Sequence, residues 1–344
     1  VYGGATQGIH LCQHDGVDEI HITGSDKTHD AIVYGVGEAG REAKANRTPT
    51  NTRRVTSELG NVSPVIVVPG PWSESDLAFH GTNLASMLTN NAGFNCNATR
   101  VIVTHEGWDQ RDALLNRVRG VLQDVAPRKA YYPGAADRFQ SFVDAHPEAE
   151  KFGNPGADEL PWTLITGVAA SDSEICTTTE AFCSVFSEMP LSADSVVDYI
   201  KRAVRTCNDD IWGTLNASII VHPKSLKDPA IAAAIEDAIS DLRYGAVAVN
   251  HWPALAYGMV TTTWGGYPGH ELHDIQSGRE VVHNTFMFDK VEKTVVRGPF
   301  RVSPKPPWFV TNSKTATIAR RLFAFEAKPS WLKVPAIAIA SAQG

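Results

Sequence analysis

Short apolar runs alternate with segments of helical periodicity along most of the chain. Residues 19–23 alternate polar and apolar side chains and are followed by a Gly-Ser pair, which predicts a strand, a turn and a helix. Residues 65–68 form a continuous apolar run that ends at Pro69-Gly70, which predicts a buried strand. Strand–turn–helix units of this kind are typical of an α/β layer.

The pattern continues in the same way toward the C-terminus. Ser73 or Ser75 caps a predicted helix in which leucines recur at helical spacing, and this helix ends at the polar sequence NNAG. Further strands are predicted in RVIVTH, AFCSVFSEM, ASIIVHP and AVAVNHW, and further helices over residues 108–121 and 228–245. The segment RGPFRVSPKPPW is a proline-rich linker before a last helix that stops at Pro329. The alternation predicts an α/β fold with a mostly parallel sheet flanked by helices.

Composition and charge narrow the class of protein. The 344 residues are 43% hydrophobic and 20% charged, which is ordinary for a soluble globular chain. The net charge of −7 gives no excess of positive charge that would attract nucleic acid or an acidic membrane. No apolar run approaches the roughly 20 residues that span a bilayer. We therefore expect neither a nucleic-acid partner nor a membrane partner.

The cysteines and histidines show no ligand spacing. Five cysteines without CxxC pairs argue against a disulfide framework or a zinc site and favour a reducing, cytoplasmic location. The twelve histidines are scattered, so we expect no metal.

One cysteine stands apart because of its surroundings. Cys96 lies in the polar loop NNAGFNCNAT, which has little apolar mass to bury. It is either a small core side chain, as most lone cysteines are, or a presented thiol. In the second case we expect an accessible sulfur with a lowered pKa and backbone N–H groups aimed at an oxyanion.

Glu58 is the second candidate. In SELGN it precedes a glycine turn and then the buried strand PVIVV. It is either a solvated carboxylate or a general base that activates water against a covalent intermediate on a cysteine.

Together these stretches resemble the aldehyde dehydrogenase superfamily. SELGNVSPVIVV is similar to the family's E-L-G-G motif, and NNAGFNCNATRVIV to its N-x-G-Q-x-C motif. VDEIHITGS, TEAFCSVF, DDIWGTLNASI, GAVAVNHW and WGGYPGH resemble further family segments in the family's order. The resemblance implies NAD(P)-dependent oxidation of an aldehyde to an acid through a cysteine thiohemiacetal and thioester, with NAD or NADP as cofactor and no metal.

The resemblance also assigns residues and domains. It implies Cys96 as nucleophile, Glu58 as base, Gly24 and Ser25 as phosphate contacts, Glu180 as the ribose contact and Phe182 beside the nicotinamide. Residues 1–60 would be the end of an incomplete dinucleotide-binding domain, 61–296 the catalytic domain, and 297–344 a linker with a C-terminal helix and tail. Because the family chain is longer at its front, we expect a truncated portion that binds nicotinamide weakly and is inactive alone, with a possible homo-oligomer.

Several residues depart from the family pattern. Asn61 replaces a glycine, Phe94 a glutamine, Cys183-Ser184 a Gly-Pro pair and Trp264 a phenylalanine. These departures leave open a non-catalytic paralogue, a coenzyme-A-acylating relative and a thiol hydrolase of esters. Retention of Glu58 favours hydrolysis, since a base is needed when water is the nucleophile.

Overall fold

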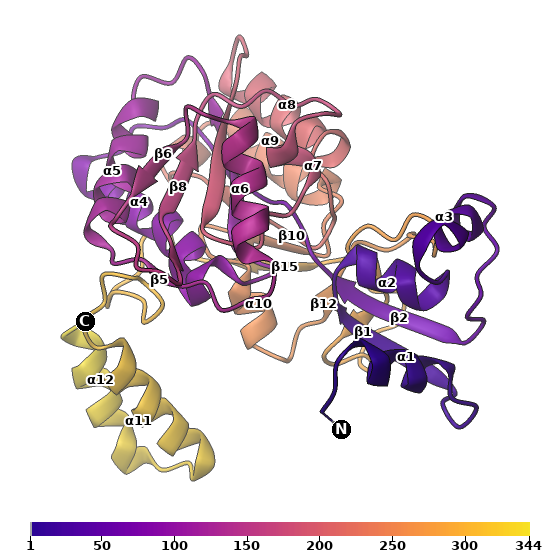
Figure 1. Ribbon diagram of the computed structural model, residues 1–344. Coiled ribbons are helices and arrows are strands. Elements are labelled where there is room, and N and C mark those ends of the chain that lie inside the picture. Colours follow the sequence, from indigo (N-terminus) through magenta and orange to yellow (C-terminus); the bar gives the residue numbers. More distant parts are fainter. Residues whose placement is uncertain (1) are drawn as a thin grey trace.

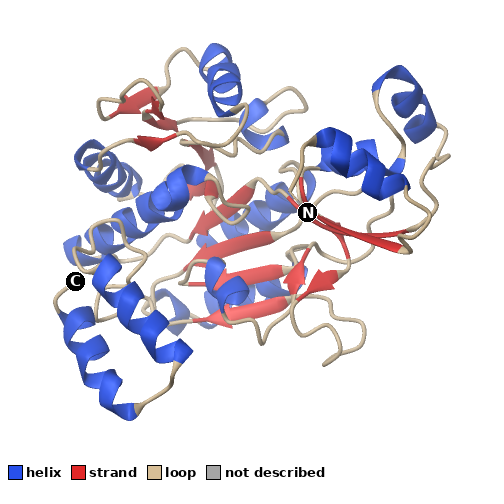
Figure 2. Ribbon diagram, turned by 60° about the horizontal axis from the view of Figure 1, so that its bottom comes forward, coloured by secondary structure: helices blue, strands red, loops and turns tan. Residues whose placement is uncertain are grey.

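The chain is built around an eight-stranded sheet, which the computed structural model describes within residues 2–344 (Figure 1, Figure 2). The strand order is β15-β11-β10-β3-β4-β9-β8-β6. The strands are β3 (Ser63–Val67), β4 (Thr99–His105), β6 (Glu150–Phe152), β8 (Trp162–Ile165), β9 (Val185–Leu191), β10 (Asn216–Ile220), β11 (Ala246–Val249) and β15 (Thr294–Arg297). All neighbours are parallel except β6 and β8, so the predicted fold class is confirmed.

Helices cover both faces of this sheet. Successive side chains of a strand point to opposite faces, and β3 follows this rule: Val65 and Val67 pack in one apolar cluster and Ile66 in another. The first cluster contains α4 (Glu74–Thr89) and α5 (Arg111–Asp124). The second contains α6 (Ala135–Ala145), α7 (Ile175–Thr178), α8 (Val196–Asp209) and α9 (Pro229–Asp241).

A smaller sheet forms a separate lobe, on the right in Figure 1. It consists of β1 (Glu19–Gly24), β2 (Arg54–Leu59) and β13 (Gly278–Arg279), with β1 parallel and β13 antiparallel to β2. The lobe also holds α1 (Ala5–Gln13), α2 (Asp26–Val33) and α3 (Gly37–Ala45). Because β2 ends at Leu59 and β3 begins at Ser63, Glu58 lies where the two sheets meet. The domain limits drawn from the sequence stay a prediction.

Two predicted elements have different bounds in the structure. The strand expected from residue 181 begins only at Val185, because Phe182 has a φ of +40° and interrupts the extended backbone. Helix α9 ends at Asp241 rather than near residue 245. Lys293 explains this end, since its ammonium group donates to the carbonyls of Ile239, Ser240 and Leu242.

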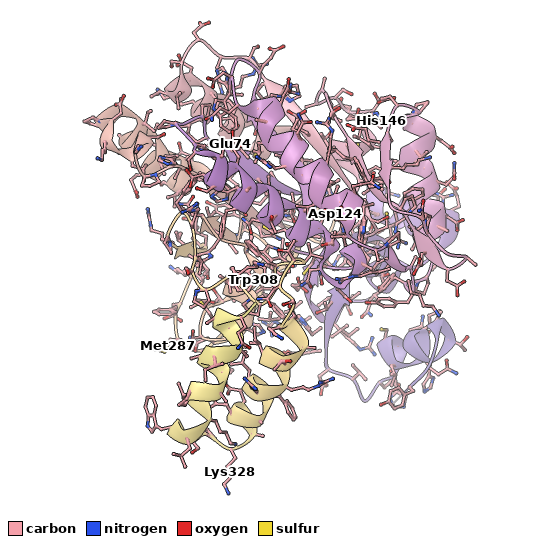
Figure 3. The ribbon with its side chains drawn as sticks, turned by 90° about the vertical axis from the view of Figure 1, so that its left-hand side faces the viewer. Glu74, Asp124, His146, Met287, Trp308 and Lys328 are labelled. Carbon is pink, nitrogen blue, oxygen red and sulfur yellow. The ribbon has the colours of Figure 1, made fainter. Side chains whose placement is uncertain are left out.

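The C-terminal segment forms a helical hairpin instead of one helix and a tail. Helix α11 (Thr315–Ala327) is followed by η3 (Trp331–Lys333) and α12 (Val334–Ala342). The hairpin extends away from the body, with Lys328 at its tip (Figure 3). Ile318 is buried, but Leu322 on the same predicted face is 40% exposed. The hairpin therefore contacts the body over only part of its apolar surface.

The remaining elements are short. They are η1 (Asn90–Gly93), β5 (Arg128–Lys129), β7 (Glu159–Leu160), η2 (Ser225–Lys227), α10 (Ala254–Gly258), β12 (Trp264–Gly265) and β14 (Val281–Val282). Across residues 2–344, none of the helices combines the length and the apolar character needed to cross a bilayer.

Candidate active site

Glu58 is held inside the junction of the two sheets. The register of β1 and β2 places Thr23 opposite Glu58, and the Thr23 side chain hydrogen-bonds the carboxylate. From the other side, Nε1 of Trp264 donates to Oε1 of Glu58 at 2.9 Å. The glutamate is only 5% exposed. Burial raises the pKa of Glu58 above its ordinary value, although these hydrogen bonds oppose the shift.

The loop that carries Cys96 is fixed by side chains from three surrounding segments. The Cys96 carbonyl accepts from Oγ of Ser63 at 3.2 Å and from Nδ2 of Asn216 at 3.0 Å. The carbonyl of the next residue, Asn97, accepts from Nε1 of Trp252 at 2.7 Å. These donors satisfy backbone oxygens that no strand pairs, so the polar loop has a defined conformation.

A sharp left-handed turn precedes the cysteine. Asn91, Ala92 and Gly93 have φ values of 50°, 57° and 81°. A Cβ at Gly93 would lie 2.2 Å from the carbonyl oxygen of Cys183, so only glycine fits there. Arg100 holds the contact together, because its buried guanidinium donates to the carbonyls of Gly93 and Cys183. The turn therefore locks the cysteine loop against the segment that leads into β9.

Cys96 and Glu58 meet at this junction. The Glu58 charge acts on the Cys96 thiol, and the partly buried Cys96 packs against the apolar cluster that contains Trp264. Burial raises the pKa of the Cys96 thiol well above its usual range, and the negative charges of Glu58 and Glu180 add to the shift. The expectation of a lowered pKa is therefore wrong, whereas the partly exposed Cys96 agrees with the expected loop near solvent. The physical reason for the raised pKa is burial of the sulfur, to which the charges of the two carboxylates add.

Glu180 is the third acidic group at the same place. Burial raises its pKa to about 7, against the attraction of Arg100 and a hydrogen bond from the Asn61 backbone. Its Oε2 lies so close to Gly60 that a Cβ there would be 2.0 Å away. Its Oε1 is buried without a hydrogen-bond partner. An acceptor left unpaired in this way fits a ligand hydroxyl, which is what the ribose of a dinucleotide would supply.

The other residues assigned from the sequence lie around these groups. Gly24 ends β1 opposite Leu59, and Ser25 caps α2 by accepting from the Thr28 N–H at 3.2 Å. The Gly24-Ser25 turn thus follows directly on the strand that holds Glu58 in register. The charge of Asp26, the next residue, reaches Glu180. The backbone N–H groups at the start of α2 favour an anion such as a phosphate group, whereas Asp26 and the acidic centre repel it.

Phe182 lies in an aromatic group rather than against Glu58. Its ring centroid is 4.8 Å from Tyr132 and 5.9 Å from Phe94. Arg138 fixes its unusual backbone by donating to the Ala181 and Phe182 carbonyls. Phe94, where the family has glutamine, is thereby explained as a packing residue two positions before Cys96.

Two further departures from the family pattern have structural roles. Asn61 is buried and donates to the Asn216 carbonyl at 2.8 Å, so it ties the Glu58 turn to β10. Trp264 supplies an indole N–H that a phenylalanine lacks, and that N–H holds Glu58. For Cys183-Ser184, the Ser184 hydroxyl donates to the Pro161 carbonyl at 2.8 Å.

Sequence reasoning missed three groups of this site: Thr23, Arg100 and the role of Trp264. Thr23 could have been found by pairing the predicted strand at residues 19–23 with the segment before Glu58. Arg100 carried no signal, because an arginine at the start of a strand is ordinarily exposed.

Known protein sequences resemble part of the chain. The aldehyde dehydrogenase family model matches residues 1–127. Over 112 residues the chain is 36% identical to 4-trimethylaminobutyraldehyde dehydrogenase of Sus scrofa and 34% identical to that of Homo sapiens. Each match covers 32% of this chain and 19% of the relative's length.

Solved structures resemble a larger part of the chain. NADP-dependent glyceraldehyde-3-phosphate dehydrogenase from Bacillus halodurans C-125, complexed with NADP, is 18% identical with a TM-score of 0.61, and the match covers 82% of this chain and 52% of that one. Gamma-glutamyl-gamma-aminobutyraldehyde dehydrogenase from Burkholderia cenocepacia J2315 is 21% identical with the same TM-score and the same coverage. The chain thus spans about half the length of these neighbours.

The family match covers the segment that contains both Glu58 and Cys96, and the structural likeness extends the same fold to most of the rest. Residues 1–127 therefore match the aldehyde dehydrogenase family, and most of the chain has the fold of solved aldehyde dehydrogenases.

Proposed function

We propose that this chain carries the cysteine chemistry of an NAD(P)-dependent aldehyde dehydrogenase, with Cys96 as nucleophile and Glu58 as base. The observation that supports it most directly is that the Cys96 thiol and the buried Glu58 carboxylate lie close enough for the carboxylate charge to raise the pKa of the thiol. A thiol and a carboxylate in such contact can exchange a proton as the sulfur attacks.

In the first step, the Cys96 sulfur bonds to the aldehyde carbon. The carbonyl π electrons move to the oxygen, and the thiol proton passes to Glu58, so a thiohemiacetal forms. The backbone N–H of Cys96 acts to lower the pKa of the Cys96 thiol. It is therefore close to the oxygen of a carbon bonded to that sulfur and can stabilise its developing charge.

The residues around the thiol fit a nicotinamide dinucleotide. The unpaired Oε1 of Glu180 suits a ribose hydroxyl, and the Gly24-Ser25 turn at the start of α2 suits a phosphate. Phe182 would lie beside the nicotinamide. When bound, NAD or NADP supplies the two-electron oxidant that converts the thiohemiacetal into a thioester.

Before the last step, Glu58 releases the proton it took from the thiol to solvent. It then takes a proton from water, and the water oxygen attacks the thioester carbon. The carbon–sulfur bond then breaks, which releases the carboxylic acid and regenerates Cys96. The raised pKa of Glu58 makes it a stronger base than an exposed glutamate. This suits proton abstraction near neutral pH.

The experiment has a cofactor-free arm and an oxidation arm. First, the protein is incubated with p-nitrophenyl acetate, and the acyl adduct is located by peptide mass spectrometry. The expected adduct is on Cys96, absent in Cys96→Ser and retained in Cys12→Ser, which removes the other partly exposed thiol. Second, a panel of aldehydes is assayed with NAD and with NADP for nicotinamide reduction.

The outcomes separate the alternatives. An adduct on Cys96 together with aldehyde-dependent nicotinamide reduction supports the proposal. An adduct without reduction for any aldehyde would favour a thiol hydrolase, and an adduct on another cysteine would remove Cys96 from the mechanism. Faster turnover on addition of coenzyme A would favour the acylating relative.

A further inference from the structure

A second thiol lies in a group of potential metal ligands outside the site described above. His146 follows the end of α6, while Glu174 and Cys176 belong to the start of α7. One ligand atom from each lies within 4.8 Å of the other two. The three side chains are largely buried, with Cys176 only 3% exposed. In Figure 3, His146 lies at the end of the body away from the C-terminal hairpin.

The side chains are already oriented toward a common point. Nε2 of His146 lies 2.9 Å from Oε1 of Glu174, and that same oxygen accepts from the Cys176 backbone N–H at 2.9 Å. On the other side of the ring, Nδ1 of His146 lies 2.8 Å from Oε1 of Glu148. A carboxylate on the distal nitrogen is the arrangement that fixes the tautomer and direction of a metal-binding imidazole.

We infer that His146, Glu174 and Cys176 bind a divalent ion of the zinc class, with Glu148 as the carboxylate that orients the histidine. Sulfur, imidazole nitrogen and carboxylate oxygen together suit Zn²⁺. Three protein ligands leave the fourth tetrahedral position to water. The thiolate and the carboxylate balance the double positive charge of the ion.

Binding involves one balanced exchange. The Cys176 thiol and Nε2 of His146 each release a proton to solvent as the sulfur–metal and nitrogen–metal bonds form. The hydrogen bond between His146 and Glu174 is thereby replaced by two metal–ligand bonds. No electron is transferred. The metal would join the end of α6 to α7, four residues before Glu180. It would therefore brace the segment that places Glu180, whether or not the proposed oxidation is correct.

The sequence could not indicate this cluster. His146 and Glu174 are separated by an intervening strand pair, and the cysteine has no CxxC or histidine partner at ligand spacing. Only the packing of α6 against α7 brings the three side chains together. The structure thus points beyond the earlier expectation of no metal.

The test is titration of the intact protein with Co²⁺, which takes zinc sites and reports thiolate ligation by a near-ultraviolet charge-transfer band. We expect one Co²⁺ per chain, a band of this kind, and its loss on addition of Zn²⁺. Cys176→Ser should abolish the band. Cys207→Ser removes a fully buried thiol outside the cluster, and Cys96→Ser removes the proposed nucleophile. Both variants should keep the band.

A second variant tests the site at a position where substitution should not unfold the protein. Glu148 is largely exposed, so Glu148→Gln should leave the protein folded yet weaken Co²⁺ affinity by roughly 10–100-fold, the usual effect of removing such an orienting group. Absence of the band in the unsubstituted protein would overturn the inference, as would its persistence in Cys176→Ser or its loss in Cys96→Ser. Unchanged affinity in Glu148→Gln would remove Glu148 from the site.

Discussion

Two places in this molecule bring a cysteine against a carboxylate, and they differ in what else touches the acid. At the Cys96 centre (Cys96, Glu58 and Glu180), the Glu58 carboxylate is held by neutral donors, Thr23 and Trp264. At the Cys176 cluster (His146, Glu174 and Cys176), the carboxylate is held by an imidazole. Burial and a nearby carboxylate raise the thiol pKa at both.

The comparison shows how a cysteine–carboxylate pair can support either proton transfer or metal binding. Burial raises the pKa of Glu58 and its hydrogen bonds offset this only in part, so Glu58 can act as a base. Beside a histidine, the carboxylate forms an ion pair instead. Burial opposes protonation of His146, but its hydrogen bonds to Glu174 and Glu148 outweigh burial and raise its pKa. The first arrangement moves protons, whereas the second offers a set of ligands.

The largest expected effect comes from Glu58→Gln. If Glu58 activates water, an activated ester should still acylate Cys96, giving a burst of one p-nitrophenolate per chain. Hydrolysis of the acyl adduct should then slow by roughly 10²–10⁴-fold, the usual contribution of a positioned base. Stopped-flow absorbance gives the burst, and intact mass gives the accumulated adduct.

The matched control is a substitution at the Cys176 cluster, where a second carboxylate lies beside a thiol. Glu174→Gln removes the carboxylate beside Cys176 and should leave the burst and the steady-state rate unchanged. An unaltered steady state in Glu58→Gln would exclude this glutamate as the base. Loss of the burst would instead mean that Glu58 is needed to take the thiol proton.

The fold and the central pair of this site could be predicted from sequence because their signals are local. Apolar runs and turn residues marked the strands β1, β3, β4, β10 and β11, and two short motifs marked Glu58 and Cys96. These features depend on neighbours in the chain. For residues 127–167 the sequence predicts only loops mixed with a short helix, and their strands, which are two to four residues long, were not predicted.

The features of the site that the sequence did not predict depend on contacts between distant segments. The indole of Trp264 reaches Glu58 across 206 positions. The expectation of a low thiol pKa considered only the polar loop, whereas the shift comes from burial and from two acids on other segments. The second C-terminal helix was missed because its apolar residues, VPAIAIASA, show no amphipathic pattern.

The next largest effect concerns Trp264, the neutral donor that distinguishes the surroundings of Glu58 from those of Glu174. Trp264→Phe removes the indole N–H from Glu58 but keeps an aromatic ring. A hydrogen bond to a charged group contributes about 1.5–3 kcal/mol, so the pKa of Glu58 should rise by roughly 1–2 units. Adduct hydrolysis should then need a higher pH by the same amount, with a similar plateau.

The measurement is the pH profile of hydrolysis of the acylated protein. Trp252→Phe is the control, because its indole donates to a backbone carbonyl and not to a carboxylate. An identical shift in both variants would attribute the change to packing.

A third effect concerns the stability cost of the acidic centre. The pKa of Glu180 is about 7 when folded and 4.5 as the ordinary value. The folded state therefore holds the proton more tightly, and this stabilisation is present below pH 4.5 and lost as pH rises through about 7. Glu180→Gln lacks the ionisation, so its stability relative to the unsubstituted protein should increase with pH.

The expected gain of the variant between about pH 5 and about pH 8 is on the order of 2–3 kcal/mol. Urea unfolding at the two pH values measures it. A difference between the two proteins that stays constant across this range would show that Glu180 ionises as an exposed glutamate does.

The smallest expected effect concerns the alkylation rates of the two thiols, Cys96 and Cys176. Because the negative charge of Glu58 contributes to the raised pKa of Cys96, Glu58→Gln should lower that pKa and increase the thiolate fraction. Alkylation of Cys96 by iodoacetamide should then speed up by about 2–10-fold near neutral pH, since the thiolate is the reacting form. Cys176 should stay unreacted in both proteins, because it is buried and its own carboxylate is untouched. Peptide mapping after limited labelling gives both rates, with Cys12, the other partly exposed thiol, as the internal reference. Equal labelling of Cys96 with and without the Glu58 carboxylate would mean that burial alone sets its pKa, and the two thiol centres would then differ in their ligands and not in their electrostatics.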